Sequence, residues 1–196
     1  MTLIGLCGMS GSGKTLVGGL FAMEGFVHIE CDKLVHERLY KRADVRDAIT
    51  LNFGPEMLVP DGVDRKKLGE TVFSNPDKLQ LLNEIVKEPI TQEVLAAAKE
   101  SGGEYILLDA PTLFEAGLDK RCKAVIGLIA PTNTCIERIV NRDGITKQAA
   151  TERIARQKNE EFLKKHCHYI LINDGNIVGL TKNALQLAER IKKGEL

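Results

Sequence analysis

The sequence predicts an α/β fold in which a parallel sheet of five strands lies between two layers of helices. Five short apolar segments have the length of buried strands. Segments with helical spacing separate the later strands, and a glycine-rich turn joins the first strand to the first helix. Apolar strands that alternate with helices are typical of a parallel sheet covered on both faces.

The elements follow in a regular order at both ends of the chain. The expected strands cover residues 2–7, 26–30, 105–111, 123–131 and 168–173. The expected helices cover residues 14–24, 132–141, 146–165 and 177–193. Gly18 and Gly19 fall inside the first helix, where each glycine costs about 1 kcal/mol relative to alanine. Close packing of this helix against another part of the chain, the segment 33–103, would explain the pair.

Residues 33–103 interrupt the alternation. This segment is polar, mostly helical in pattern, and carries several glycines and prolines. We therefore expect a helical insertion on an α/β core, with the core formed by residues 1–32 and 104–196.

Composition excludes several classes of protein. The 196 residues suit one domain with an insertion, and 27 basic residues balance 27 acidic residues. A formal net charge of zero argues against nonspecific nucleic-acid binding. No apolar run is long enough to span a membrane, and the start does not resemble a signal peptide. The five scattered cysteines are typical of reduced thiols, so we expect a cytoplasmic protein.

The segment from Gly8 to Thr15 matches the pattern G-x-x-x-x-G-K-[ST] between a strand and a helix. Glycines let phosphate oxygens approach backbone N–H groups, and the helix N-terminus adds further donors. The pattern predicts a nucleoside triphosphate site in which Lys14 contacts the outer phosphates and Thr15 ligates Mg²⁺. The expected nucleotide-binding residues are Gly8, Gly11, Ser12, Gly13, Lys14, Thr15 and Leu16. The alternative is a glycine-rich turn without a ligand.

Two aspartates follow predicted strands. Asp32 comes after the second strand and Asp109 ends the third. Ligands bind at the carboxyl ends of the strands in an open parallel sheet, so a carboxylate there can contact Mg²⁺ or act as a base. For Asp32, a helix N-cap is the competing interpretation because a helical pattern follows.

Several further segments resemble the dephospho-coenzyme A kinases, and the resemblance covers nearly the whole chain. The opening "IGLCGMSGSGKT" is generic, whereas the others together are much more specific. These are "IECDKLVHE", "FGPEMLVPDGVDRKKL", "LLDAPTLFEAGL", "RIVNRDGITKQAATERIARQ" and "INDGNIVGL". In the first of them, Asp32 takes the position of the family's catalytic aspartate.

The resemblance implies a P-loop NTPase core, a coenzyme-binding helical domain at 33–103 and a helical lid at about 138–165. It implies transfer of the γ-phosphate of ATP to the ribose 3′-hydroxyl of dephospho-CoA. Asp32, Lys14 and Arg142 are the expected catalytic residues. The residues expected to contact the acceptor are Asp32, His36, Arg65, Asp109 and Pro111. The acceptor cavity is expected between the strand ends and the insertion.

The lid assignment depends on arginines on two helices. Arg138 and Arg142 share a helix face, and Arg153 and Arg156 follow on the next helix. Such arginines can neutralise charge on a transferring phosphoryl group, although a solvated, ion-paired helix surface is the alternative. For His36, a place on the surface is as compatible with the sequence as a place in the acceptor site.

For Arg65, an ion pair with Asp61 or Asp64 is as compatible with the sequence as contact with a phosphate of the acceptor. Another small-molecule or nucleoside monophosphate kinase, or a nucleotide-binding regulatory module, remains an alternative function. The expected partners are ATP and dephospho-CoA, without nucleic acid or membrane, and the expected assembly is a monomer or a weak homo-oligomer.

Overall fold

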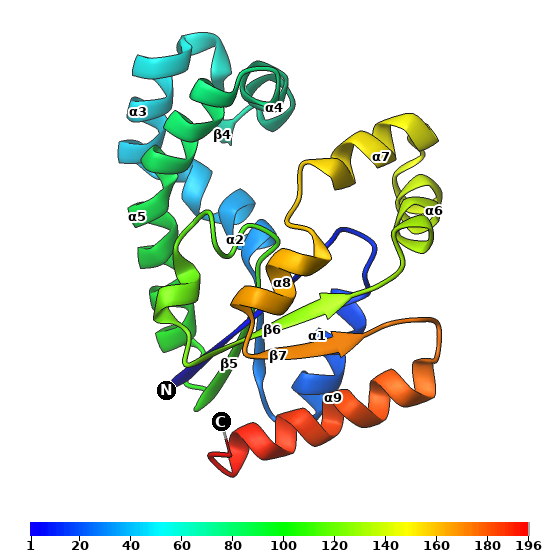
Figure 1. The fold of residues 1–196 in the computed structure, drawn as a ribbon. Coiled ribbons are helices and arrows are strands. Elements are labelled where there is room, and N and C mark those ends of the chain that lie inside the picture. Colours follow the sequence, from blue (N-terminus) through cyan, green and yellow to red (C-terminus); the bar gives the residue numbers. More distant parts are fainter. Residues whose placement is uncertain (196) are drawn as a thin grey trace.

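The computed structural model describes residues 1–195 and places a five-stranded parallel sheet at the centre of the molecule (Figure 1). Its strands are β1 (Thr2–Gly8), β2 (Val27–Glu30), β5 (Tyr105–Asp109), β6 (Ala124–Ile129) and β7 (Tyr169–Ile172). They lie in the order β2-β5-β1-β6-β7, and each neighbouring pair is parallel. The predicted α/β fold and all five strands are confirmed.

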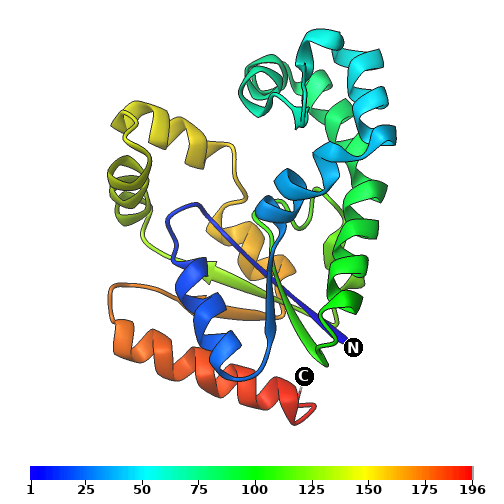
Figure 2. The same ribbon diagram turned by 180° about the vertical axis from the view of Figure 1, so that it is seen from behind.

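One face of the sheet is covered by α1 (Lys14–Met23) and α9 (Ile177–Lys192). Figure 2, which shows the molecule from behind, gives a view of these two helices. Ile4 and Leu6 of β1 point to this side and pack with Phe21 of α1 and Leu187 of α9. Alternate residues of β1 therefore serve opposite faces, as the two-residue period of a strand requires.

The other face is covered by α5 (Pro76–Glu100), α8 (Glu160–His166) and the short 3-10 helix η3 (Leu118–Arg121). Leu3 and Cys7 of β1 point to this side. Val94 of α5 and Leu163 of α8 belong to the same apolar cluster, which completes the third layer.

The segment after β2 is mostly helical, as predicted. It contains α2 (Cys31–Glu37), η1 (Leu39–Lys41), α3 (Ala43–Phe53), η2 (Pro55–Met57), the strands β3 (Leu58–Val59) and β4 (Gly62–Val63), and α4 (Arg65–Phe73). The β3–β4 hairpin was not predicted. Apolar residues of α3 and α4 belong to the same apolar cluster as Leu3 of β1 and Val94 of α5. This segment therefore shares a core with the sheet. The division into core and insertion remains a prediction.

The predicted single helix at 146–165 is wrong, because the chain forms two helices there. α6 (Thr132–Asp143) ends at Gly144, whose φ of 65° suits glycine. α7 (Lys147–Ala155) begins at Thr146, whose hydroxyl accepts from the Ala149 N–H as expected. The chain then leaves the helix until Asn159 caps α8 by accepting from the Phe162 N–H. This Asn cap starts a new helix with its own direction.

The explanation expected for Gly18 is also wrong. A Cβ on Gly18 would lie 2.6 Å from Nε2 of His28, which belongs to β2 of the core and not to residues 33–103. Gly19 has no atom within 4 Å of the corresponding position. Only the first glycine is therefore required by packing.

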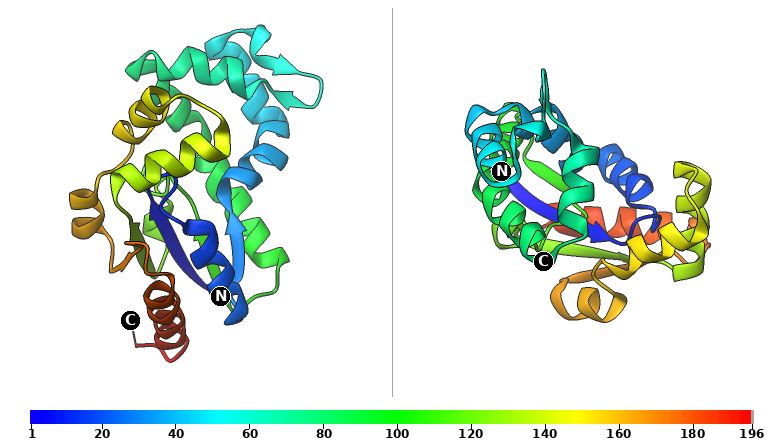
Figure 3. Two further views of the ribbon diagram at one scale, coloured as in Figure 1. Left: turned by 90° about the vertical axis from the view of Figure 1, so that its right-hand side faces the viewer. Right: turned by 90° about the horizontal axis from the view of Figure 1, so that it is seen from above.

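The helical elements rise from the sheet in two groups (Figures 1 and 3). α3, α4 and part of α5 stand on one side, and α6 and α7 stand on the other. The space between the two groups lies above the phosphate-binding motif.

Within residues 1–195, no helix is both long and apolar enough to cross a membrane.

Candidate active site

The segment between β1 and α1 folds into a tight loop that requires glycine. Gly11 and Gly13 have φ angles of 79° and 103°, which side-chain-bearing residues rarely adopt. A Cβ on Gly11 would lie 2.6 Å from the Cys135 carbonyl oxygen, and one on Gly13 would lie 2.6 Å from Nδ2 of Asn173. The loop is therefore held closely against α6 and the end of β7.

Two buried polar side chains lie at this loop, one that bonds to it and one that belongs to it. Asn173 follows β7 and donates from Nδ2 to the Ser12 carbonyl oxygen at 2.7 Å. The Ser12 side chain is fully buried, and its hydroxyl has no hydrogen-bond partner in the structure. The loop thus carries one buried hydroxyl whose bonding capacity is unused.

The Lys14 ammonium lies inside the loop. Its Nζ donates to the carbonyl oxygens of Gly8 at 3.0 Å and Met9 at 3.3 Å. Burial lowers the pKa of Lys14, whereas the nearby carboxylates of Asp109 and Asp32 raise it. Lys14 is therefore a partly desolvated cation at the centre of a ring of backbone groups, which is a suitable arrangement for binding phosphate.

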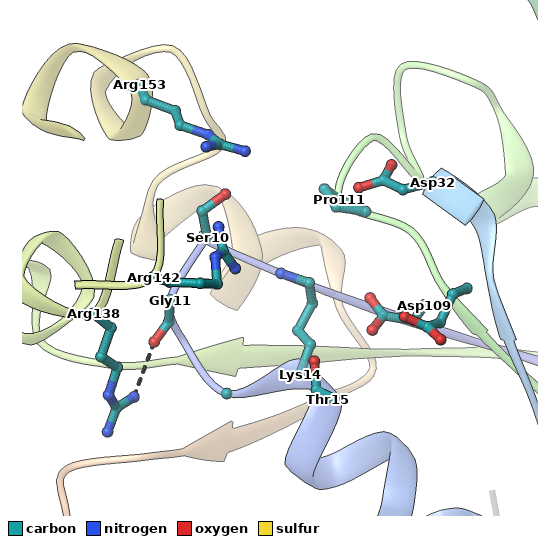
Figure 4. Close-up of a pocket in the computed structure, with 12 residues that line it drawn as sticks. Ser10, Gly11, Lys14, Thr15, Asp32, Asp109, Pro111, Arg138, Arg142 and Arg153 are labelled. Atoms are coloured by element: carbon teal, nitrogen blue, oxygen red, sulfur yellow. Dashed lines mark hydrogen bonds between the residues drawn. The ribbon is translucent and has the colours of Figure 1, made fainter. Parts of the chain in front are cut away.

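A cavity of about 470 Å³ opens above the loop (Figure 4). It is lined by Ser10, Gly11, Gly13, Lys14, Thr15, Glu30, Asp32, Asp109, Pro111, Arg138, Arg142 and Arg153. Carboxylates from the ends of β2 and β5 lie on one side, and arginines of α6 and α7 lie on the other. The cavity thus has an anionic wall facing a cationic wall.

Eight of the predicted site residues are brought together in this cavity: Gly11, Gly13, Lys14, Thr15, Asp32, Asp109, Pro111 and Arg142. The five that do not line it are Gly8, Ser12, Leu16, His36 and Arg65. Ser10 and Glu30 line the cavity but were not predicted. Glu30 could have been found, because it lies two residues before Asp32 in the segment that carries the family resemblance.

The position of the cavity agrees with one part of the prediction for the acceptor site. It lies at the carboxyl ends of the strands, as predicted. None of the residues that line this cavity comes from 33–103, so the contact of that segment with the acceptor remains a prediction.

Asp32 is not the N-cap of α2. The helix begins at Cys31 with Glu30 in the capping position, and no side chain makes a capping hydrogen bond there. Asp32 is exposed at the cavity, but the protein around its carboxylate reduces hydration and raises its pKa, and the neighbouring Asp109 carboxylate raises it further. Lys14, Arg65 and Arg153 act in the opposite direction and lower it. A carboxylate with a raised pKa is a stronger base than an ordinary aspartate.

Asp109 is buried at the end of β5, directly beside Glu30 in the sheet register. Its Oδ2 lies 3.6 Å from Nε2 of His28, which has no hydrogen-bond partner. Asp109 is therefore the more enclosed of the two aspartates in the cavity.

One arginine connects α6 to the loop, and two others meet at Asp143 of α6. Arg138 donates to the Gly11 carbonyl oxygen at 2.9 Å. Arg142 and Arg153 both bind the Asp143 carboxylate, at 2.7 Å and 2.8 Å. Asp143 thus binds two exposed guanidinium groups at the mouth of the cavity. The bond from Arg142 and the charges of Arg142 and Arg153 hold the pKa of the Asp143 carboxyl below its usual range.

The segment between α7 and α8 is also tied to the loop. Gln157 accepts from the Ser10 N–H at 2.8 Å and donates to the Ser10 hydroxyl at 2.9 Å. These two bonds tie the connection between α7 and α8 to the phosphate-binding loop.

A comparison of the sequence with models of protein families identifies the family of the chain. The family model described as dephospho-CoA kinase matches residues 2–179. The chain belongs to the dephospho-CoA kinase family. A relative from Fusobacterium nucleatum with the name dephospho-CoA kinase is 33% identical over 191 residues, which cover 96% of this chain and 98% of the relative.

Solved structures share the fold of this chain. A Thermus thermophilus protein has a TM-score of 0.80 and 27% identity, and the match covers 96% of this chain and 97% of that one. The dephospho-CoA kinase from Campylobacter jejuni has a TM-score of 0.69 over 99% of this chain and 98% of its own. At 23% identity, that second structure shows that the fold is shared.

Proposed function

We propose that the chain transfers the γ-phosphate of ATP to the ribose 3′-hydroxyl of dephospho-CoA, which yields coenzyme A and ADP, the last step of CoA biosynthesis. The observation that carries this proposal is the single cavity that joins the phosphate loop, two carboxylates and the arginines of α6 and α7. A kinase requires these three groups at one site, to hold the nucleotide, activate the hydroxyl and stabilise the transferring phosphoryl group.

The loop and Lys14 bind the triphosphate. Lys14 exchanges its two backbone carbonyl partners for oxygens of the outer phosphates, which satisfies a partly buried cation with a stronger, charged partner. The N–H groups at the start of α1 contribute further donors. Gly8, Gly11, Ser12, Gly13 and Leu16 serve this binding through their backbone.

The cavity also suits Mg²⁺. The metal prefers oxygen ligands, and it usually takes one or two carboxylates together with substrate phosphates. The Thr15 hydroxyl would hold it, with the Asp109 carboxylate beside it in the same cavity. When bound, the metal neutralises negative charge on the phosphates.

Asp32 acts as the general base. Its raised pKa places proton acceptance closer to neutral pH, and its side chain faces the cavity from the end opposite the arginines. Asp32 accepts the proton of the ribose hydroxyl as that oxygen attacks the γ-phosphorus. Pro111 limits the space beside the attacking oxygen.

Arg142 stabilises the charge that develops on the transferred group. It is exposed at the cavity mouth and paired with Asp143, so it can turn from that carboxylate to the phosphoryl oxygens. We assign residues 138–165 to a lid that carries this arginine. Residues 33–103 form the acceptor-binding part, in which His36 and Arg65 contact the coenzyme.

The decisive experiment is ATP turnover with and without dephospho-CoA, followed by phosphorus NMR of the product. Turnover that requires dephospho-CoA and gives a 3′-phosphate supports the proposal. Turnover stimulated by another small hydroxyl compound or a nucleoside monophosphate would assign a different kinase. ATP binding without transfer to any acceptor would assign a regulatory module.

We further propose a cytoplasmic protein that is a monomer or a weak homo-oligomer. Light scattering after size-exclusion chromatography tests the second point, with a stable oligomer at micromolar concentration as the contrary result.

A further inference from the structure

Cys7 and Cys167 are far apart in the sequence but lie in contact. Their Sγ atoms are 3.6 Å apart. Cys7 lies on β1 immediately before Gly8, and Cys167 follows the last residue of α8. The contact therefore joins the strand that leads into the phosphate loop to the helix that follows the proposed lid.

Gly127 of β6 makes this contact possible. It lies beside Cys7 in the sheet register. A Cβ on Gly127 would lie 2.9 Å from the Cys167 sulfur, so any larger residue would displace that thiol. The two sulfurs meet across the bare backbone of β6.

The two thiols differ in accessibility and acidity. Cys7 is buried, and its hydrogen bond with Cys167 together with burial raises the pKa of Cys7. Cys167 is partly exposed, and the same hydrogen bond lowers the pKa of Cys167. The thiolate is the reactive form of cysteine, so Cys167 is the sulfur that an oxidant in solution reaches first and that reacts with it.

We propose that Cys7 and Cys167 form a reversible disulfide on reaction with a hydroperoxide, and that this bond slows phosphoryl transfer. The Cys167 thiolate attacks the peroxide, so an S–O bond forms, the O–O bond breaks, and an alcohol or water leaves. The Cys7 sulfur then attacks the resulting sulfenic acid. The S–S bond forms, the S–O bond breaks, and hydroxide leaves with the Cys7 proton as water.

The bond must shorten the sulfur separation from 3.6 Å to about 2.05 Å. Cys7 is covalently linked to Gly8, whose carbonyl oxygen accepts from Lys14. The shift is therefore transmitted to the start of the phosphate loop on one side and to α8 on the other. A displacement of about 1 Å at a catalytic site can reduce the rate a hundredfold. We expect the disulfide to reduce turnover at least tenfold.

Trypsin separates all five cysteines, which makes the test direct. Cys7 lies in the peptide 1–14 and Cys167 in the peptide 166–182. The full-length protein is treated with one equivalent of hydrogen peroxide, alkylated and digested without reductant. We expect the linked peptides 1–14 and 166–182 by mass spectrometry, loss of turnover, and recovery of both signals with dithiothreitol.

Two variants provide the controls. Cys122→Ser removes another partly exposed thiol, whose sulfur donates to the Leu118 carbonyl oxygen, and should leave the peroxide response unchanged. Cys167→Ser should retain turnover after peroxide, and Cys167→Ala replaces it if the serine variant misfolds.

Three results would overturn the proposal. They are two unlinked peptides in peroxide-treated wild type, linked peptides with turnover within twofold of the reduced protein, and equal loss of turnover in the Cys167 variant. Because peptide mapping uses the wild-type chain and requires no kinase activity, failure of this proposal is distinguishable from failure of the proposed function.

Discussion

Gly18 and His28 pack so closely that a Cβ on Gly18 would lie 2.6 Å from Nε2 of the His28 ring. The ring fills the space that a side chain on α1 would occupy. His28 in turn lies beside Asp109, so this contact places α1, β2 and the cavity in fixed relation.

This contact predicts opposite effects for two adjacent substitutions. Gly18→Ala should lower the free energy of unfolding by about 1–3 kcal/mol, because overpacking outweighs the better helix propensity of alanine. Gly19→Ala should raise it by up to about 1 kcal/mol, because open space surrounds that position. Urea unfolding measures both. A stabilising Gly18→Ala substitution would contradict the packing argument.

Lys14→Ala should abolish phosphoryl transfer while the thermal midpoint stays within a few degrees of wild type. The variant lacks the cation at the outer phosphates, where several kcal/mol of transition-state stabilisation is expected. Turnover and a melting curve are measured on one preparation. Lys33→Ala removes an exposed lysine of α2 and serves as the control. Near-normal turnover of Lys14→Ala would exclude this loop as the catalytic ATP site.

Asp32→Asn should reduce turnover by roughly a hundredfold or more, because an amide cannot accept the hydroxyl proton. Its thermal midpoint should remain close to that of wild type, since Asp32 makes no capping bond in α2. Asp47→Asn, at an exposed position of α3, is the matched control. If Asp32→Asn retained most of the activity, the assignment of the base would pass to Asp109.

Arg65→Gln should shift the acid limb of kcat/KM to higher pH. Arg65 lowers the pKa of Asp32, so its removal raises that pKa. Activity requires the ionised base and is lost as pH falls through the pKa of Asp32, so a higher pKa moves the loss to higher pH. Lys66→Gln changes the net charge equally at the next position and should shift the limb less. Equal shifts in both variants would indicate a general charge effect.

Local sequence was sufficient to predict the strands, the phosphate loop and most of the residues around the cavity. The loop was predictable because its glycines, Lys14 and Thr15 perform their roles within one short segment. Ser10 was missed because the phosphate-binding pattern leaves its position open to any residue, and Glu30 because only the resemblance of its segment, and no local pattern, points to it. Their places in the cavity depend on the β2–β5 register and on the contact with Gln157.

The α/β class, the nucleotide motif and the family could be read from the amino-acid sequence alone, because these depend on periodicity and on residues that lie close together in the chain. The strand order, the position of α6 and α7 beside the loop, and the contacts of Gly18 with His28 and of Cys7 with Cys167 emerge in the folded protein alone. Packing and hydrogen bonding depend on distance in space and not on separation along the chain. Residues separated by 160 positions come into contact only once the sheet has assembled.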